Sequence, residues 1–93
     1  MNRYFYSPYY QYNGVTHSQP FREELTLEEV NYNIESFFSD IQQYFDEDTV
    51  IIERITENCI KITTEISEIE CDERVKNCLN SLDLYAHKNC NNL

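Results

Sequence analysis

The strongest constraint on the fold is a long stripe of apolar residues at helical spacing. Between Leu27 and Phe45, apolar side chains recur every three or four residues, which places them on one face of a helix. Thr26 and Glu29 fit a capping box, in which each side chain satisfies a free backbone N–H at the helix start. The sequence therefore predicts an amphipathic helix over about residues 26–45, with a stripe made of Leu27, Val30, Ile34, Phe37, Phe38, Ile41 and Phe45.

A second apolar stripe predicts another amphipathic helix over about residues 69–88. Ser67 and Glu70 again have the spacing of a capping box, and acids gather at the expected positive pole of the helix. On this helix Leu84 would lie on the polar, exposed side, and His87 would be a cation near the negative pole. The stripe consists of Cys71, Val75, Cys78, Leu79, Leu82, Tyr85 and Ala86.

The segment between the helices has the pattern of a β-hairpin over residues 49–67. Isoleucines at 60, 62 and 66 alternate with polar residues, so this strand has an apolar and a polar face. The turn is expected at residues 56–59. The strand before it is ambiguous, because Val50 and Ile52 lie on one face while Ile51 and Ile55 lie on the other.

Residues 1–25 differ in composition from the rest of the chain. Five of the eight tyrosines lie in the first twelve residues, and Asn13-Gly14 is a favoured two-residue hairpin turn. We expect strands near 3–6 and 9–12, continuing at 15–18. The alternative is a mobile tail that becomes ordered on binding a partner.

These elements predict one domain over residues 1–93, because a chain of this length has room for a single core. The expected fold is α+β. It is a two-layer sandwich in which a small antiparallel sheet, made of the N-terminal strand or hairpin and the hairpin 49–67, is covered on one face by the helices 26–45 and 69–88.

The charge balance limits the kinds of partner. Seventeen acids against seven bases give a net charge of −10, which repels nucleic-acid phosphates and anionic membranes and attracts basic surfaces.

No apolar run reaches the roughly 18 residues needed to span a membrane, and the N-terminal residues lack the apolar region of a signal peptide. We therefore expect a cytoplasmic protein whose four cysteines are reduced. If the chain were exported, three disulfide pairings would be open.

The sequence argues against metal, cofactor and catalytic sites. Successive cysteines are 12, 7 and 12 residues apart, without the short pairs that zinc sites use. Nothing in the sequence brings His17 or His87 to a cysteine, and the single glycine excludes a glycine-rich phosphate loop. We expect no cofactor, no bound metal and no enzyme activity.

The expected function is protein binding through the acidic surface. Tyr32 would project from the first helix among acids, an arrangement suited to an arginine-rich partner. In size, charge and lack of motifs the chain is similar in type to short virus- and phage-encoded antagonists, including anti-CRISPR proteins and DNA mimics. The first hypothesis is an inhibitor or regulator that blocks the basic groove of a nucleic-acid-handling protein, in the host cytoplasm if the chain is viral. Its contact residues would be Glu28, Glu29, Tyr32, Asp40, Asp46, Glu47, Asp48 and Glu65.

The alternative function is that of a structural subunit or adaptor. Its N-terminal tyrosines would add a strand to a partner's sheet or form a homodimer. Deleting residues 1–22 would then abolish association.

Overall fold

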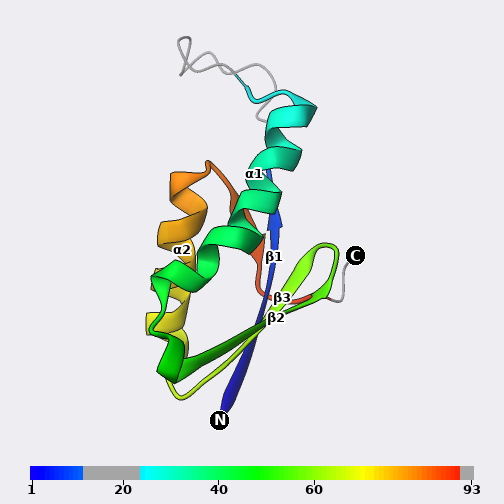
Figure 1. Cartoon of the computed structure of the whole chain (residues 1–93). Helices are drawn as coiled ribbons and strands as arrows, with labels where there is room; N and C mark the ends of the chain where they lie inside the picture. The colour runs from blue at the N-terminus through cyan, green and yellow to red at the C-terminus, as the bar shows by residue number, and fades with distance from the viewer. Residues whose placement is uncertain (12–23, 91–93) are drawn as a thin grey trace.

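The protein is a small α+β structure with a four-stranded antiparallel sheet and two α-helices, in agreement with the predicted class. The structure is a computed structural model that describes residues 1–11 and 24–90 (Figure 1). Within these ranges, no helix has both the length and the apolar character needed to cross a membrane. The elements in chain order are β1 (Asn2–Tyr9), α1 (Leu27–Asp40), the 3₁₀ helices η1 (Ile41–Tyr44) and η2 (Glu47–Thr49), β2 (Val50–Thr56), β3 (Cys59–Thr64), α2 (Glu68–Ser81) and β4 (Tyr85–His87).

The N-terminal strand β1 lies inside the sheet, whose order is β2-β3-β1-β4. Its residues 2–6 pair with β3, and its residues 7–9 pair with β4. Pro8 falls in the second part, where the strand has left β3, which suits a residue without an N–H to donate. The prediction of separate strands at 3–6 and 9–12 is wrong at residues 7 and 8, because β1 runs through them, and at residues 10 and 11, which follow its end. The Asn13-Gly14 turn and the strand at 15–18 lie outside the described residues.

The predicted start of the first helix is confirmed. The Glu29 N–H donates to Thr26 Oγ1 at 3.2 Å, and the Thr26 N–H donates to Glu29 Oε1 at 2.9 Å. The α-helix ends at Asp40 and continues as the tighter η1 to Tyr44, so the helical segment as a whole ends close to the predicted boundary. Phe37 and Ile41 of the predicted stripe are fully buried, whereas its first residue, Leu27, is 68% exposed.

The predicted hairpin is also confirmed, with Glu57 and Asn58 joining β2 to β3. The structure resolves the ambiguity of the first strand. Val50 is buried and Ile52 is half-buried against the core, whereas Ile51 and Ile55 are 55% and 43% exposed on the other face of the sheet. Ile60 and Ile62 of β3 are buried beside them.

The second helix ends seven residues earlier than predicted. At its C-terminus the Leu84 N–H donates to the Leu79 carbonyl at 2.9 Å and the Asp83 N–H to the Asn80 carbonyl at 3.3 Å, which is a Schellman motif. Asp83 takes the left-handed conformation (φ 57°) that reverses the chain. Tyr85–His87 then forms β4, so His87 is not a helix-end cation and Leu84 is not exposed but 3% accessible.

The core contains residues from both α-helices, the 3₁₀ helix η1 and the strands. Cys71 and Cys78 are buried within it, as expected for small apolar side chains. The expectation of four reduced thiols is wrong for the other two, because Cys59 and Cys90 form a disulfide with Cα atoms 5.9 Å apart. The core residues are Tyr6, Phe37, Ile41, Phe45, Val50, Ile60, Ile62, Cys71, Val75, Cys78, Leu79 and Leu84.

Replacing Asp83 with glycine should stabilise the protein by about 0.5–1 kcal/mol, because glycine adopts positive φ without a side-chain clash. The change also removes a negative charge from the negative pole of α2. Asp83→Asn is the matched control, since asparagine removes the charge and keeps a similar tolerance for this conformation. Urea unfolding should rank the proteins Gly above Asn above wild type. A glycine variant no more stable than the asparagine variant would contradict the backbone argument.

Candidate functional site

Three of the predicted contact residues lie at the N-terminal end of α1. Glu28 and Tyr32 are exposed, and Tyr32 has 74% of its surface accessible. Glu29 is exposed but serves the capping box, where hydrogen bonds from the Thr26 backbone and side chain lower the pKa of its carboxyl. Of the three, Glu28 and Tyr32 are therefore the ones whose polar groups are available to a partner.

The remaining predicted residues lie near the far end of α1 and the adjacent end of the sheet. Asp40 ends α1, while Asp46 and Asp48 are exposed in the turn that leads to β2. Glu47 is the first residue of η2. Glu65 follows β3 and lies 3.7 Å from the amine of Met1, so it has an internal partner.

The predicted contact residues do not form one patch. Glu28 and Asp40 are twelve residues apart on one helix, which at 1.5 Å per residue corresponds to about 18 Å. Figure 1 shows the start of α1 and the turn before β2 at opposite ends of the molecule. The structure therefore brings together Glu28 and Tyr32 at one end and Asp40, Asp46 and Asp48 at the other.

The segment that joins these two groups contains no basic residue. Between Leu27 and Thr49 the chain has seven acids and no lysine, arginine or histidine. Within the described ranges, the cation that forms an ion pair with this segment is Arg54 of β2. Its guanidinium forms two hydrogen bonds with the Glu35 carboxylate, at 3.0 and 2.8 Å, and lowers the pKa of that carboxyl. In the same ranges, no ion pair involves Glu28, Asp40, Asp46 or Asp48.

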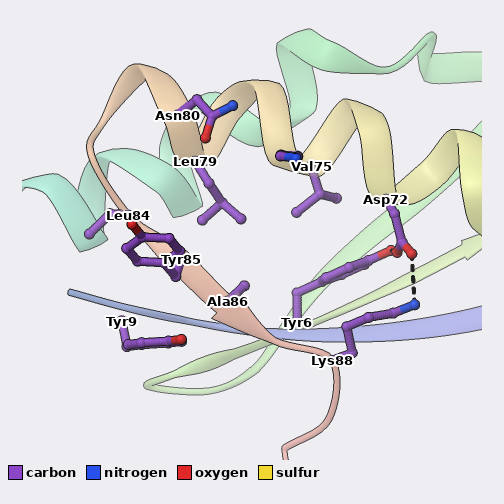
Figure 2. Close-up of a pocket in the computed structure, with 11 residues that line it drawn as sticks. Tyr6, Tyr9, Asp72, Val75, Leu79, Asn80, Leu84, Tyr85, Ala86 and Lys88 are labelled. Atoms are coloured by element: carbon purple, nitrogen blue, oxygen red, sulfur yellow. Dashed lines mark hydrogen bonds and ion pairs between the residues drawn. The ribbon is translucent and has the colours of Figure 1, made fainter. Parts of the chain in front are cut away.

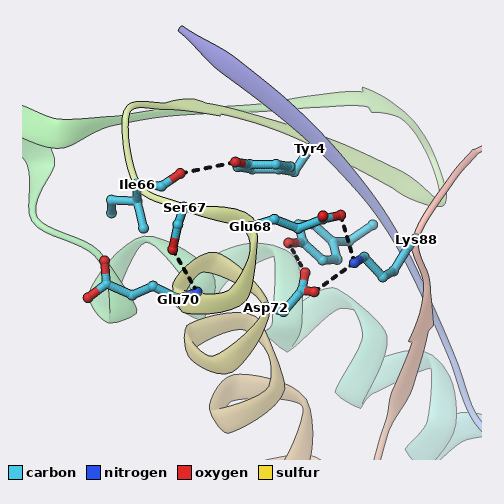
Figure 3. Close-up of polar contacts among 8 residues, drawn as sticks. Tyr4, Ile66, Ser67, Glu68, Glu70, Asp72 and Lys88 are labelled. Atoms are coloured by element: carbon cyan, nitrogen blue, oxygen red, sulfur yellow. Dashed lines mark hydrogen bonds and ion pairs between the residues drawn. The ribbon is translucent and has the colours of Figure 1, made fainter.

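Three other cations in the described part of the chain form ion pairs on α2 and the sheet. Lys88 binds both Glu68 (2.8 Å) and Asp72 (2.7 Å), as Figure 3 shows, and these hydrogen bonds raise its pKa to about 12. Arg74 lies 3.6 Å from Glu70, and Lys61 of β3 lies 3.5 Å from Glu53. Charge is thus largely compensated on the side of the molecule formed by α2 and the sheet, and largely uncompensated along α1 and the turn after it.

A cleft that sequence reasoning missed lies between α2, β1 and β4. Its volume is about 290 Å³. Val75 and Leu79 line it from α2, and Leu84 and Ala86 line it from the segment after the helix. Figure 2 shows their side chains together with the rings of Tyr6, Tyr9 and Tyr85. The sequence could not indicate this cleft while Leu84 to Ala86 were assigned to a helix.

One end of the cleft carries a partly exposed polar network. The Tyr6 hydroxyl donates to Asp72 Oδ1 at 2.6 Å, and Lys88 Nζ donates to Asp72 Oδ2 at 2.7 Å (Figure 2). Burial of the Tyr6 ring and its hydrogen bond to Asp72 raise the pKa of its hydroxyl. Both oxygens of Asp72 are therefore satisfied by the protein itself.

In the part of the chain that the structure describes, no group of three or more His, Cys, Asp or Glu side chains is arranged to hold a metal ion. Comparisons of the chain with protein-family models, with curated proteins and with solved structures found no match.

Proposed function

We propose that this protein is an acidic inhibitor or regulator that binds a basic surface of a nucleic-acid-handling protein. The observation that carries the proposal is the run from Leu27 to Thr49, with seven acids and no base. The binding surface, here called the acidic edge, consists of Glu28, Tyr32, Asp40, Asp46 and Asp48. The proposed scaffold is a two-layer sandwich whose helices cover one face of the sheet and hold the acidic edge along α1.

The spacing of the acidic edge suits a basic groove built for nucleic acid. Phosphates along one strand of a duplex are about 3.4 Å apart in the axial direction, so the roughly 18 Å between Glu28 and Asp40 corresponds to about five phosphate steps. Carboxylates at both ends of α1 could then occupy two separate phosphate sites of the partner. Tyr32 adds apolar area and a face that can accept an arginine.

The adaptor alternative has less support, because the described N-terminal tyrosines take part in the fold. Tyr6 is buried, and the Tyr4 hydroxyl donates to the Ile66 carbonyl at 3.1 Å. Tyr9 stacks on His87, and the Tyr10 hydroxyl accepts from the Leu25 N–H. Deleting residues 1–22 would remove β1 from the interior of the sheet and would be expected to unfold the protein. Loss of association in this deletion variant would therefore not distinguish a lost contact from unfolding.

The test compares two double variants with the same net charge. Glu28→Gln with Asp48→Asn neutralises one carboxylate at each end of the acidic edge, whereas Glu57→Gln with Glu73→Gln neutralises two exposed carboxylates outside it. Tagged wild-type protein first captures its partner from a lysate of the source organism, or of the host cell if the chain is viral, at about 50 mM salt, where exposed charges are weakly screened. The affinity of the captured partner is then measured for wild type, for the edge variant Glu28→Gln with Asp48→Asn and for the control Glu57→Gln with Glu73→Gln.

We expect the edge variant to bind at least about tenfold more weakly and the control to bind as wild type, because charge complementarity depends on position. Wild-type affinity should also fall steeply between about 50 and about 200 mM salt. Equal effects of the two variants, or an affinity that is insensitive to salt, would contradict the proposal.

A further inference from the structure

We propose that the cleft between α2, β1 and β4 binds a small aromatic carboxylate. The proposal is independent of the acidic edge, which lies on α1 and the turn after it. Four features of the cleft carry it: the volume, the chemistry of the walls, the fixed position of those walls and the cation at the rim.

The volume of the cleft limits the size of the ligand. A cavity of about 150 Å³ is enough for benzene, and drug-sized ligands occupy about 300 Å³ or more. At about 290 Å³, this cleft has room for one fused bicycle or for one ring with a short substituent. A polymer segment or a nucleotide with its sugar and phosphates would be too large.

The walls of the cleft favour an aromatic body. Aliphatic side chains from α2 and β4 face the rings of Tyr6, Tyr9 and Tyr85, and aromatic rings pack well against such rings in stacked or edge-on arrangements. Tyr9 is held by stacking, with its centroid 4.3 Å from His87 and 5.9 Å from Tyr85. Val75 and Leu84 are 1% and 3% exposed, so their positions are set by the core. The site is thus largely formed before a ligand arrives.

The charges that line the cleft favour an anion. Two lysines, Lys76 and Lys88, and one carboxylate, Asp72, line the cleft. Lys88 is already shared by Asp72 and Glu68, so Lys76 is the lysine left to pair with a ligand. Over the described residues, Lys76 enters no ion pair and the Asn80 amide no hydrogen bond. The two lie four residues apart on α2, so their side chains emerge on the same face about 5–6 Å apart.

Lys76 and Asn80 can therefore share the two oxygens of one carboxylate at the rim while the ring enters the apolar part of the cleft. A single unpaired cation matches a monoanion. A phosphate ester would bring a second negative charge that this acidic protein leaves uncompensated. The favoured ligand class is thus a carboxylate attached to one or two aromatic rings.

Titration of the ¹⁵N-labelled full chain with 2-naphthoate, followed by NMR, tests the proposal. A ligand of about 13 heavy atoms at the usual efficiency should bind with a Kd of roughly 1 mM. Shifts should be confined to α2, β4 and the end of β1. The neutral analogue 2-naphthamide should bind at least about fivefold more weakly, because it does not pair with Lys76.

Lys76→Gln should remove the preference for 2-naphthoate over 2-naphthamide, and Lys61→Gln, a matched change on β3 outside the cleft, should keep it. The edge variant Glu28→Gln with Asp48→Asn should bind 2-naphthoate as wild type does, so failure of one proposal can be told from failure of the other. No saturable shift up to about 10 mM 2-naphthoate, or an unchanged preference in Lys76→Gln, would overturn the assignment.

Discussion

Reduction of the Cys59–Cys90 disulfide should lower the free energy of unfolding by about 3.5 kcal/mol. The bond closes a loop over a sequence separation of 31 residues, and on the chain-entropy model a loop of this length restricts the unfolded state by about that amount. The loss is large beside the roughly 5–15 kcal/mol by which such domains are stable. It should be visible as a lower urea midpoint in the presence of dithiothreitol.

Cys90→Ser provides the control for this effect. The variant should match reduced wild type in stability and should not respond to dithiothreitol, because its three remaining cysteines, Cys59, Cys71 and Cys78, then form no disulfide. Alkylation of wild type in denaturant should label two cysteines before reduction and four after it. Labelling of four without reductant would show that the bond is absent.

The same measurement bears on where the protein acts. Disulfides persist mainly in oxidising compartments, so the Cys59–Cys90 bond weakens the expectation of a cytoplasmic protein with reduced thiols. The proposed nucleic-acid-handling partner belongs mainly to reducing compartments. If protein isolated from its source carries the bond, the search for a basic partner should begin outside the cytoplasm.

Elements with a strong local signal could be predicted from the sequence. The first helix has both a capping box and an uninterrupted apolar stripe, and the hairpin over 49–67 has alternating isoleucines on its second strand. The placement of β1 inside the sheet could not be predicted. It depends on pairing with β3, more than fifty residues away, which no local pattern encodes.

The end of the second helix was missed for a different reason. Tyr85 and Ala86 continue the helical spacing of the stripe, so periodicity alone favours a longer helix. The chain instead reverses at Asp83, where a glycine would have been the usual signal. Because Leu84 and Tyr85 were assigned to the wrong element, the cleft that they line with α2 was invisible in the sequence.

The acidic residues were identified as exposed, but their grouping required coordinates. Sequence position does not reveal that Glu65 reaches the Met1 amine or that Arg54 crosses from β2 to Glu35. Nor does it reveal that the acids at the two ends of α1 are separated by about 18 Å. What the sequence did indicate is the excess of acid itself, from which the proposed partner class follows.

A second large effect is expected on the alkaline side of neutrality, where the protein should lose about 2 kcal/mol of stability by pH 10.5 through Cys78 alone. Burial raises the pKa of this thiol from 9.0 to about 12. Between pH 9 and pH 12 the Cys78 thiol therefore keeps its proton in the folded state but loses it in the unfolded state. The stability is fully present below pH 9 and falls as the pH rises toward 12, by about 1.4 kcal/mol per pH unit.

Urea unfolding between pH 8 and 11 should test this, with Cys78→Ala as the decisive variant. Cys71 and Tyr6 add to the loss in the wild type, because burial raises the pKa of each group. At pH 8 the alanine variant should be less stable than wild type, because it has lost a buried side chain. Its free energy of unfolding should, however, decrease less steeply as the pH rises. The difference in stability between the two proteins should therefore be about 2 kcal/mol smaller at pH 10.5 than at pH 8. Parallel declines would show that the Cys78 thiol titrates alike in the folded and unfolded states, and hence that the space around it between α2 and the rest of the core is open to water.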